Sequence, residues 1–450
     1  MRRLVFCLNA LLLIAPATLS QTPLPTREEP PQSAAPIIVK TAPAIAPDNS
    51  AAATLSSDSA LLYGRQGVLV ETTDGHVVME QRADETFNPA SAVKLATALE
   101  ALHVFGPAHR FVTAVWTNGT IDPMSGTLNG DLIISGRDPS FHYEQAMMLA
   151  HELNRQGIRV VTGDLIISSR FTMNFDSSAR RSGEALYDTL DAELRPVQAS
   201  RAWNDEHQLL GDAASFPTLP SVSVQGAVYV DAVPKGARML LLRRSSKLVD
   251  ILKVLLCFSN NFMAERIGDT LGGTSALRRF LINSIGLNPN EVFLSSTSGL
   301  GVNRLTPRAM MKILRALRDE LAKNNLSAAD ILPVAGLDPG TLQKRFTTAP
   351  SRGSVIAKTG TLIRTDGGAS ALVGQLLTAN NETLLFVIFN QRGNVQRFRN
   401  LQDALVTQLQ LARGGPAPFS YHQPSLAMRL ASSELDATTQ TVARPDEYEP

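Results

Sequence analysis

Three short polar strings, far apart in the chain, constrain the fold of this protein more than any other feature. They are Ser91-Ala-Val-Lys94, Ser259-Asn-Asn261 and Lys358-Thr-Gly360. Each string alone is a weak signal, because such short patterns arise by chance in a chain of 450 residues. If the three form one site, the fold must bring widely separated segments together.

The first string joins a hydroxyl to an amine. Ser91 and Lys94 are three residues apart, so on a helix they share one face, and the Ala/Leu/Val-rich residues 91–105 predict a helix there. Helix N–H groups beside a first-turn serine suit a developing oxyanion. A serine hydroxyl needs an adjacent base, and a lysine serves only if burial or a neighbouring cation, such as Lys358, lowers its pKa.

A purely structural interpretation of this string competes with the catalytic one. A helix N-cap serine followed by a solvated lysine explains the string when it is considered alone. The residues around the lysine favour the catalytic interpretation, since Ala92, Val93, Leu95 and Ala96 are all apolar.

The second string lies between two helical runs, residues 248–258 and 263–271. A loop on a rigid frame is a common place for site residues. The Ser259 hydroxyl can relay a proton to a leaving amine, and the Asn261 amide can bind a substrate carbonyl and a lysine at once. An ordinary cap and turn explains this string equally well by itself.

The third string follows the strand-like run 354–357. Gly360 removes a side chain where a ligand would lie along a strand edge, and Lys358 with Thr359 can hold a carboxylate. A strand that ends in a turn is the plain alternative.

Together the three strings supply a nucleophile, a base, a proton relay, an amide and a carboxylate site, which is a complete set for acyl transfer.

Composition excludes several other function classes. The formal net charge is +1, so nothing favours nucleic acid as a partner. The seven histidines form no cluster with ligand spacing, and we expect neither a metal nor a cofactor. Of the two cysteines, Cys7 lies in the N-terminal segment and Cys257 in an apolar run, where a buried small residue is expected.

The N-terminus has the pattern of a targeting segment. Arg2 and Arg3 precede the apolar residues 4–14, which are too few for a stable membrane anchor. We therefore expect a signal peptide over residues 1–20 and a periplasmic or otherwise exported protein without a strong anchor after cleavage. A retained N-terminal anchor is the alternative, and it also places the rest of the chain outside the cytoplasm.

Hydrophobic patterning predicts a sheet built from both ends of the chain. Hairpins are expected around Asp74-Gly75 and Asn380-Asn381, with a closing helix over 395–412. The middle of the chain instead shows a helical run at 140–157 and short strand-like runs at 111–116, 128–134, 160–167 and 222–230, without a fixed repeat period. This change of character indicates an inserted domain.

The expected domain boundaries follow from these patterns and from composition. The Pro/Ala/Ser/Thr-rich residues 21–57 cannot bury a core, and the end of the chain is similarly polar. We expect a disordered linker over 21–57, a catalytic domain from 58–106 and 241–413, an inserted domain over 107–240 and a disordered tail over 414–450.

Longer segments around the strings resemble one family. Phe87-Asn-Pro-Ala-Ser-Ala-Val-Lys94 is similar to the nucleophile segment of the class C low-molecular-mass penicillin-binding proteins, the D-alanyl-D-alanine carboxypeptidase/endopeptidase group. The resemblance continues, in one order over roughly residues 60–412, through Gly130-Asp-Leu-Ile-Ile-Ser-Gly-Arg-Asp-Pro139, Ser259-Asn-Asn-Phe-Met-Ala-Glu265, Leu332-Pro-Val-Ala-Gly336, Gly340-Thr-Leu342 and Arg345.

The resemblance implies a fold and a role for each site residue. The fold is α/β (α+β), a serine β-lactamase/DD-peptidase-like antiparallel sheet with flanking helices and an inserted strand-rich domain. The implied roles are nucleophile for Ser91, base for Lys94, proton shuttle for Ser259, substrate amide for Asn261, carboxylate binding for Lys358 and Thr359 beside Gly360, and an oxyanion hole from the N–H groups of Ser91 and Thr361.

The implied function is an exported serine-type D-Ala-D-Ala carboxypeptidase or endopeptidase that acts on peptidoglycan stem peptides and is acylated by β-lactams. A β-lactamase or small-ester hydrolase with the same residues, or a non-catalytic cell-wall binding protein, are the alternatives. The sequence does not distinguish carboxypeptidase from endopeptidase activity, and it gives no oligomeric state.

Some positions depart from the family pattern. Asn260 stands where the family has an Asp. The segment Ser298-Gly-Leu-Gly-Val-Asn303 is one residue shorter than the matching family segment and lacks its arginine. The segment Asp338-Pro-Gly340 contains a proline that the family pattern does not have. The insertion after the first string is also short for this group. These departures bear on substrate preference more than on acylation.

Overall fold

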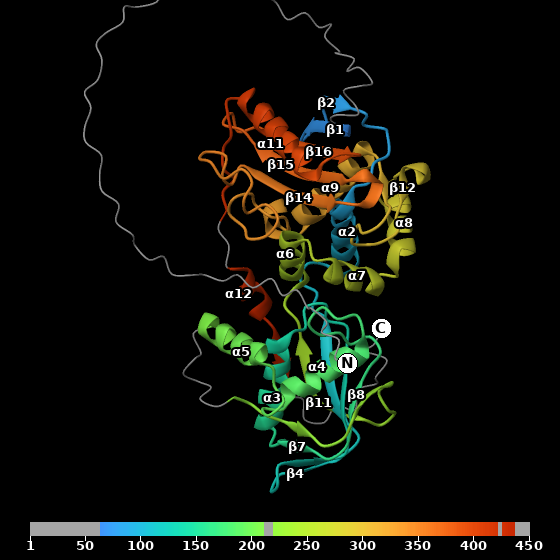
Figure 1. Ribbon diagram of the computed structural model, residues 1–450, viewed down its shortest axis with the longest axis vertical. Coiled ribbons are helices and arrows are strands. Elements are labelled where there is room, and N and C mark those ends of the chain that lie inside the picture. Colours follow the sequence, from blue (N-terminus) through green and yellow to red (C-terminus); the bar gives the residue numbers. More distant parts are fainter. Residues whose placement is uncertain (1–63, 211–218, 422–424, 437–450) are drawn as a thin grey trace, which may run out of the picture. The chain divides into compact units, whose positions relative to one another are not determined.

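A computed structural model describes residues 64–210, 219–421 and 425–436 of the chain (Figure 1). The expected signal peptide over 1–20 and linker over 21–57 lie outside these residues. Within the described ranges, no helix is both long enough and apolar enough to cross a membrane.

A five-stranded antiparallel sheet joins the two ends of the catalytic region. The predicted hairpins at residues 67–79 and 369–390 are confirmed, and β1 pairs with β16 along its whole length. The strand order is β14-β15-β16-β1-β2, with β1 (Arg65–Thr72), β2 (Val77–Gln81), β14 (Val355–Leu362), β15 (Ala369–Leu377) and β16 (Thr383–Gln391).

Helices cover both faces of this sheet, which explains why its central strands are apolar without alternation. Val387 and Phe389 pack into a core with the helices on one face, whereas Phe386 and Ile388 pack against the other face together with Val406 of the closing helix. The helices of this region are α2 (Lys94–Phe105), α6 (Leu248–Phe258), α7 (Asn261–Thr270), α8 (Gly273–Asn283), α9 (Pro307–Lys323) and α11 (Val395–Leu411).

The strand-rich middle of the chain forms two further sheets. Their orders are β10-β8-β6-β3-β11-β17 and β4-β5-β7-β9. The strands are β3 (Val112–Thr117), β4 (Thr120–Asp122), β5 (Thr127–Asn129), β6 (Leu132–Gly136), β7 (Val160–Val161), β8 (Leu165–Ile167), β9 (Ser223–Val224), β10 (Val228–Val230) and β11 (Arg238–Arg244), with helices α3 (Tyr143–Arg155), α4 (Ala179–Leu190) and α5 (Val197–Leu210).

Three runs that we expected to be single strands are each divided into two strands of different sheets. A glycine marks each division, and the three turns stack on one another through hydrogen bonds from Gly163 N to Gly130 O (3.1 Å) and from Gly226 N to Gly163 O (3.0 Å). A Cβ on Gly163 would lie 2.3 Å from Asp131 Oδ1. The turn is therefore repeated, but helices of different length separate its copies, so the sequence shows no fixed period.

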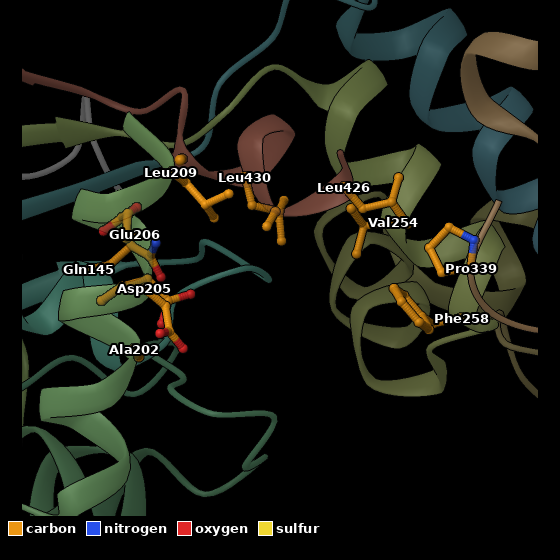
Figure 2. A pocket seen from close by; sticks show the side chains of 13 residues that line it. Gln145, Ala202, Asp205, Glu206, Leu209, Val254, Phe258, Pro339, Leu426 and Leu430 are labelled. Carbon is orange, nitrogen blue, oxygen red and sulfur yellow. The ribbon is translucent and has the colours of Figure 1, made fainter. Parts of the chain in front are cut away.

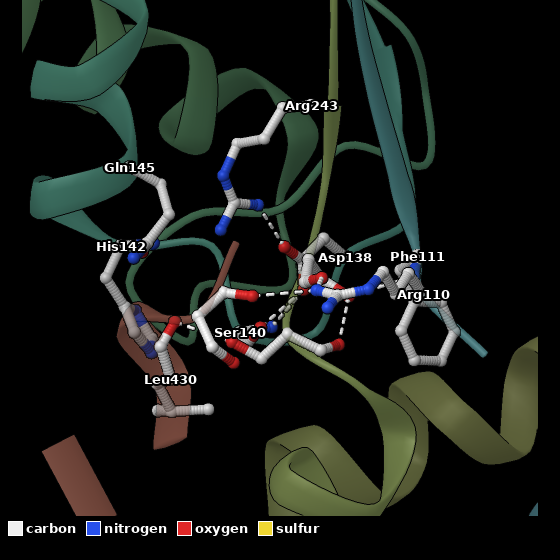
Figure 3. A network of polar contacts seen from close by, with 11 residues as sticks. Arg110, Phe111, Asp138, Ser140, His142, Gln145, Arg243 and Leu430 are labelled. Atoms are coloured by element: carbon white, nitrogen blue, oxygen red, sulfur yellow. Dashed lines mark hydrogen bonds and ion pairs between the residues drawn. The ribbon is translucent and has the colours of Figure 1, made fainter. Parts of the chain in front are cut away.

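A buried ion pair ties the strand-rich region together at the Gly-Arg-Asp-Pro segment (Figure 3). Arg243 Nη1 lies 2.6 Å from Asp138 Oδ2, and both side chains are at most 1% exposed. The other Asp138 oxygen accepts hydrogen bonds from Ser140 N and Oγ. This part of the family-like pattern therefore has a structural role.

Two boundaries differ from our expectations. Strand β11 extends through residue 244 and pairs with β3, so the strand-rich region continues past residue 240. Part of the expected disordered tail is also ordered, as α12 (Leu426–Ala431) and β17 (Glu434–Asp436), and β17 pairs with β11. The polar composition concealed the buried Leu426, which packs against Val254 and Cys257.

Short elements complete the described chain. The 3₁₀ helix η1 (Ala90–Val93) precedes α2, and the others are η2 (Pro289–Glu291), β12 (Val292–Phe293), β13 (Arg304–Leu305), α10 (Ala328–Ile331) and η3 (Thr365–Gly367).

Candidate active site

Ser91 and Lys94 meet at the start of α2. The predicted helix begins as the 3₁₀ turn η1, which contains Ser91, and the α-helix proper starts at Lys94. Lys94 Nζ lies 3.0 Å from Ser91 Oγ. Ala90 just before them has a φ of 48°, in the left-handed region that non-glycine residues adopt at a cost. The nucleophile candidate thus sits on a strained, tightly packed turn.

Lys94 is fully buried, and burial lowers its pKa to about 7. Its amine is also held by two oxygens from other segments, Asn261 Oδ1 at 2.7 Å and Ser298 O at 2.6 Å. A lysine with a pKa near neutrality can accept a proton from a serine. The solvated-lysine interpretation of the first string is therefore wrong.

The second string reaches the site through a tight turn between α6 and α7. Ser259 has a φ of 55°, and Asn261 opens α7. Asn260 Oδ1 accepts a hydrogen bond from Met263 N at 3.0 Å and so caps the helix. The cap needs only a side-chain oxygen acceptor, which explains how Asn260 can stand where the family pattern has an Asp.

Lys358 on β14 contacts Ser259. Its Nζ lies 2.8 Å from Ser259 Oγ and 2.7 Å from the carbonyl oxygen of Thr359. Burial, with a smaller contribution from Lys94, lowers the pKa of Lys358 well below its usual value. The amine is buried and is not among the residues that line the site cavity, and its expected role as a carboxylate-binding cation stays a prediction.

Gly360 is required for packing. A Cβ there would lie 2.6 Å from the carbonyl oxygen of Pro89 and 3.1 Å from the Cβ of Ala90. The absent side chain lets β14 pass directly beside the Ser91 turn. We expected Gly360 to leave room for a ligand, and the structure uses that room for the protein's own backbone.

A cavity of about 680 Å³ opens at these groups, and its wall includes two cations that sequence reasoning missed. Arg399 of α11 donates a hydrogen bond from Nη2 to Thr361 Oγ1 (3.0 Å), and Lys344 is exposed on the same wall. The lining residues are Ser91, Ser259, Asn261, Thr341, Lys344, Arg345, Thr359, Thr361, Gln396, Arg399, Asn400 and Asp403.

Glu265 supports the loop that contacts Lys94. Its carboxylate accepts hydrogen bonds from Thr297 Oγ1 (2.7 Å) and Ser298 N (3.0 Å). This fixes the Ser298 carbonyl on the Lys94 amine, so the shortened loop still reaches the site through its backbone. We noted Glu265 in the sequence only as part of a longer segment, without a role.

A second hollow, of about 490 Å³, shares no lining residue with this cavity (Figure 2). Its apolar wall includes Leu209 of α5, Phe258 of α6 and Leu430 of α12. It holds none of the three strings. Cys257 nearby is buried, and burial raises its thiol pKa to about 12, so it is not a nucleophile.

Solved structures show the same fold. The predatory endopeptidase Bd3459 of Bdellovibrio bacteriovorus is 21% identical with a TM-score of 0.69, covering 83% of this chain and 99% of that one. Penicillin binding protein 4 of Haemophilus influenzae is 23% identical with a TM-score of 0.57, covering 78% of this chain and 99% of that one. The predicted fold class is confirmed.

Curated relatives and a family model match most of the sequence. The D-alanyl-D-alanine carboxypeptidase of an Actinomadura species is 27% identical over 78% of this chain and 82% of its own. DacB of Haemophilus influenzae, with the same enzyme name, is 25% identical over 67% of this chain and 79% of its own. The model of the D-Ala-D-Ala carboxypeptidase 3 (S13) family matches residues 49–200 and 189–411, which include all three strings. The chain therefore belongs to the D-Ala-D-Ala carboxypeptidase 3 (S13) family and is a serine-type D-Ala-D-Ala carboxypeptidase.

Proposed function

We propose that this chain is an exported DD-peptidase that cleaves peptidoglycan stem peptides through an acyl-enzyme at Ser91. The observation that carries the proposal is the buried Lys94 amine, 3.0 Å from Ser91 Oγ. The expected signal peptide over 1–20 is part of this proposal. The catalytic domain over 58–106 and 241–413 is also part of the proposal, because every residue that lines the site cavity falls within those ranges.

The acylation step follows from the contacts. Ser91 Oγ attacks the carbonyl carbon of the penultimate D-Ala while the neutral Lys94 amine takes its proton. The N–H groups of Ser91 and Thr361 stabilise the oxyanion. Breakage of the C–N bond releases the terminal D-Ala, whose amine receives a proton through Ser259. Water then hydrolyses the ester and regenerates Ser91.

The remaining site residues position the peptide. The Asn261 amide oxygen already contacts Lys94, and its NH₂ group is the donor for a substrate carbonyl. Lys358 holds the Ser259 hydroxyl in place. The terminal carboxylate binds the hydroxyls of Thr359 and Thr361, which lie two residues apart on β14 and both line the cavity.

We expect Arg399→Gln to lower kcat/KM for a peptide ending in free D-Ala by about 10- to 100-fold, the effect of one hydrogen bond to a charged group. The guanidinium that contacts Thr361 would pair with the terminal carboxylate. A matched peptide ending in D-alaninamide should lose little. Arg397→Gln is the control, because this exposed arginine of the same helix does not line the cavity. Equal losses for both peptides would contradict the assignment.

β-Lactams are the second proposed class of ligand. Bd3459 has been solved as its penicillin G-acylated form, and the Haemophilus penicillin binding protein 4 as a complex with a β-lactam. Both proteins share the fold of this chain, and a β-lactam presents a reactive carbonyl and a carboxylate as the peptide does. These likenesses support acylation of Ser91 by penicillins.

The direct test of the proposed function is release of D-Ala from a purified pentapeptide. The wild-type protein should release D-Ala and Ser91→Ala should release none above background. A wild-type protein that binds peptidoglycan without releasing D-Ala or cleaving a cross-link would overturn the proposal in favour of a binding protein.

A further inference from the structure

A hydrogen-bonded cluster outside the site cavity joins three segments that carry the proposed acylation groups. Its members are the side chains of Asn88, Arg304 and Asp366, none of which lines the cavity. Asn88 belongs to the turn that carries Ser91, and Asp366 belongs to η3, which follows β14. Arg304 follows the loop 298–303, whose first carbonyl contacts the proposed base. The cluster therefore lies where it can set the relative positions of these segments.

Asn88 ties the Ser91 turn to the two other segments. Its side chain is fully buried, and its Oδ1 accepts a hydrogen bond from Ala90 N at 3.1 Å. Its Nδ2 donates to Gly301 O (3.0 Å) and to Asp366 Oδ2 (2.7 Å). Ala90 has the left-handed φ of 48°, and such a conformation persists only where surrounding contacts fix it. The Asn88 amide supplies one of these contacts, and its own orientation is fixed by its two acceptors.

The Asp366 carboxylate holds the cluster together. Arg304 donates to it from Nη2 to Oδ1 (2.8 Å) and from Nη1 to Oδ2 (2.9 Å), the bidentate geometry of a strong ion pair. Arg304 Nη1 also donates to the carbonyl oxygen of Asn303 at 2.8 Å. The hydrogen bonds from Arg304, with a smaller contribution from Asn88, lower the pKa of Asp366. The carboxylate is therefore charged at neutral pH and serves two donors from different segments.

The loop 298–303 is the part of the site that departs from the family pattern, since it is one residue shorter and lacks an arginine. Its first carbonyl nonetheless lies 2.6 Å from Lys94 Nζ. A Cβ on Gly299 would lie 2.0 Å from Ala90 O, so the loop packs directly on the turn that carries the nucleophile candidate. Glu265 fixes one end of this loop, and the cluster fixes the other. A displacement of the loop would therefore disturb the proposed nucleophile and base together.

We propose that Asp366 is a positioning residue for acylation, which acts through Asn88 on the Ser91 turn and through Arg304 on the loop that contacts Lys94. The inference rests on the proposed function, because the placement of Ser91 matters only if Ser91 is acylated. A misplacement of about 1 Å can cost about 100-fold in rate. The effect falls on the rate of acylation and not on ligand binding, because neither hydrogen-bond partner of the carboxylate lines the cavity.

Two substitutions break the ion pair from either side. Asp366→Asn removes the charge and keeps the shape, and asparagine tolerates the φ of 57° at this position, which most residues do not. Arg304→Gln removes the other partner. The control is Asp176→Asn in the strand-rich region, where Arg181 binds the carboxylate through Nε (2.7 Å) and Nη2 (2.8 Å) in the same bidentate manner. Neither residue of the control pair lines the site cavity.

The experiment follows acylation by penicillin G over time at several concentrations. It gives the limiting rate constant, the half-saturating concentration and the end point, which counts folded sites. Asp366→Asn and Arg304→Gln should each lower the limiting rate constant by about 10- to 100-fold and leave the half-saturating concentration within about threefold. The double variant should lose little more than the worse single variant, because both substitutions break one pair. Asp176→Asn should match the wild-type protein, and all end points should agree.

Two results would overturn the positioning role. One is a limiting rate constant of Asp366→Asn within about threefold of the wild-type value, against the 100-fold that misplacement can cost. The other is a lower end point with an unchanged rate constant, since the carboxylate would then only stabilise the folded protein. A wild-type protein that forms no penicillin adduct and releases no D-Ala from a pentapeptide would instead refute the proposed function itself.

Discussion

Replacing Lys94 by alanine should lower kcat/KM for a D-Ala-D-Ala peptide by about 100- to 10,000-fold, the range that a positioned general base contributes. The amine is buried, lies 3.0 Å from Ser91 Oγ and is fixed by Asn261 and Ser298. Steady-state release of D-Ala measures the effect. Lys312→Ala, at an exposed lysine of α9, is the matched control. A Lys94→Ala enzyme within a few fold of wild type would remove Lys94 from the mechanism.

The same residue predicts the pH dependence. Only the unprotonated amine can take the Ser91 proton, and the pKa of Lys94 is about 7. We therefore expect kcat/KM to fall about tenfold for each pH unit below 7 and to level off above it, since this parameter follows the free enzyme. A profile whose acidic limb lies near the ordinary lysine pKa would show that Lys94 is solvated in the working enzyme.

Removing the carboxylate of Asp338 should cost about 3–5 kcal/mol of unfolding free energy, as expected when a buried ion pair loses one partner. Lys253 Nζ lies 2.7 Å from Asp338 Oδ2, and neither side chain is exposed. Asp338 also accepts hydrogen bonds from Val334 N and from the Tyr421 hydroxyl. Asp338→Ala would leave the Val334 N–H and the Tyr421 hydroxyl without this acceptor, and it would leave the buried Lys253 amine without its counter-charge, held only by the Ala329 and Leu332 carbonyl oxygens.

Urea unfolding followed by circular dichroism measures this loss. Glu184→Ala, which breaks an exposed pair with Arg180, should cost less than about 1 kcal/mol and serves as the comparison. The double variant Lys253→Met/Asp338→Leu should recover only the part of the loss that comes from the unpaired Lys253 charge, because Val334 N and the Tyr421 hydroxyl still lack their acceptor. An Asp338→Ala variant as stable as Glu184→Ala would contradict the importance of the pair.

The sequence predicted the sheet, and it singled out the residues that we propose for acylation, because both have local signatures. The hairpins show apolar strands around Asp74-Gly75 and Asn380-Asn381, and their pairing follows from the turn. Each of the three strings is contiguous, so its residue types could be recognised before their neighbours in space were known. That Ser91 and Lys94 share one turn followed from their spacing alone.

Long-range features had no comparable signature. Lys358 could not be oriented from sequence, because both faces of its sheet are buried under helices. Arg399 lies on α11, whose polar residues have the pattern of an ordinary solvent-facing helix surface. Its contact with Thr361 depends on how α11 packs, which the sequence does not show. The Ser298 contact with Lys94 uses a backbone carbonyl, which every residue has.

The strand-rich region shows the same limit. Three runs whose sequences predict continuous strands contain a glycine, at Gly130, Gly163 and Gly226. Only the stacking of the turns at these glycines shows that each run is divided between two sheets. Residues 425–436 belong to the polar end of the chain that we expected to be disordered, yet Leu426 is buried and β17 pairs with β11. A single buried anchor and one strand pairing are enough to order a segment whose composition indicates disorder.

Mass spectrometry of the penicillin-treated protein tests the central claim most directly. A brief reaction with penicillin G, followed by proteolysis, should yield one acyl adduct on the peptide that contains Ser91 in the wild-type protein and no adduct in Ser91→Ala. An adduct that persists in Ser91→Ala, or that maps to another residue of the wild-type protein, would contradict the assignment of Ser91 as the acylated nucleophile.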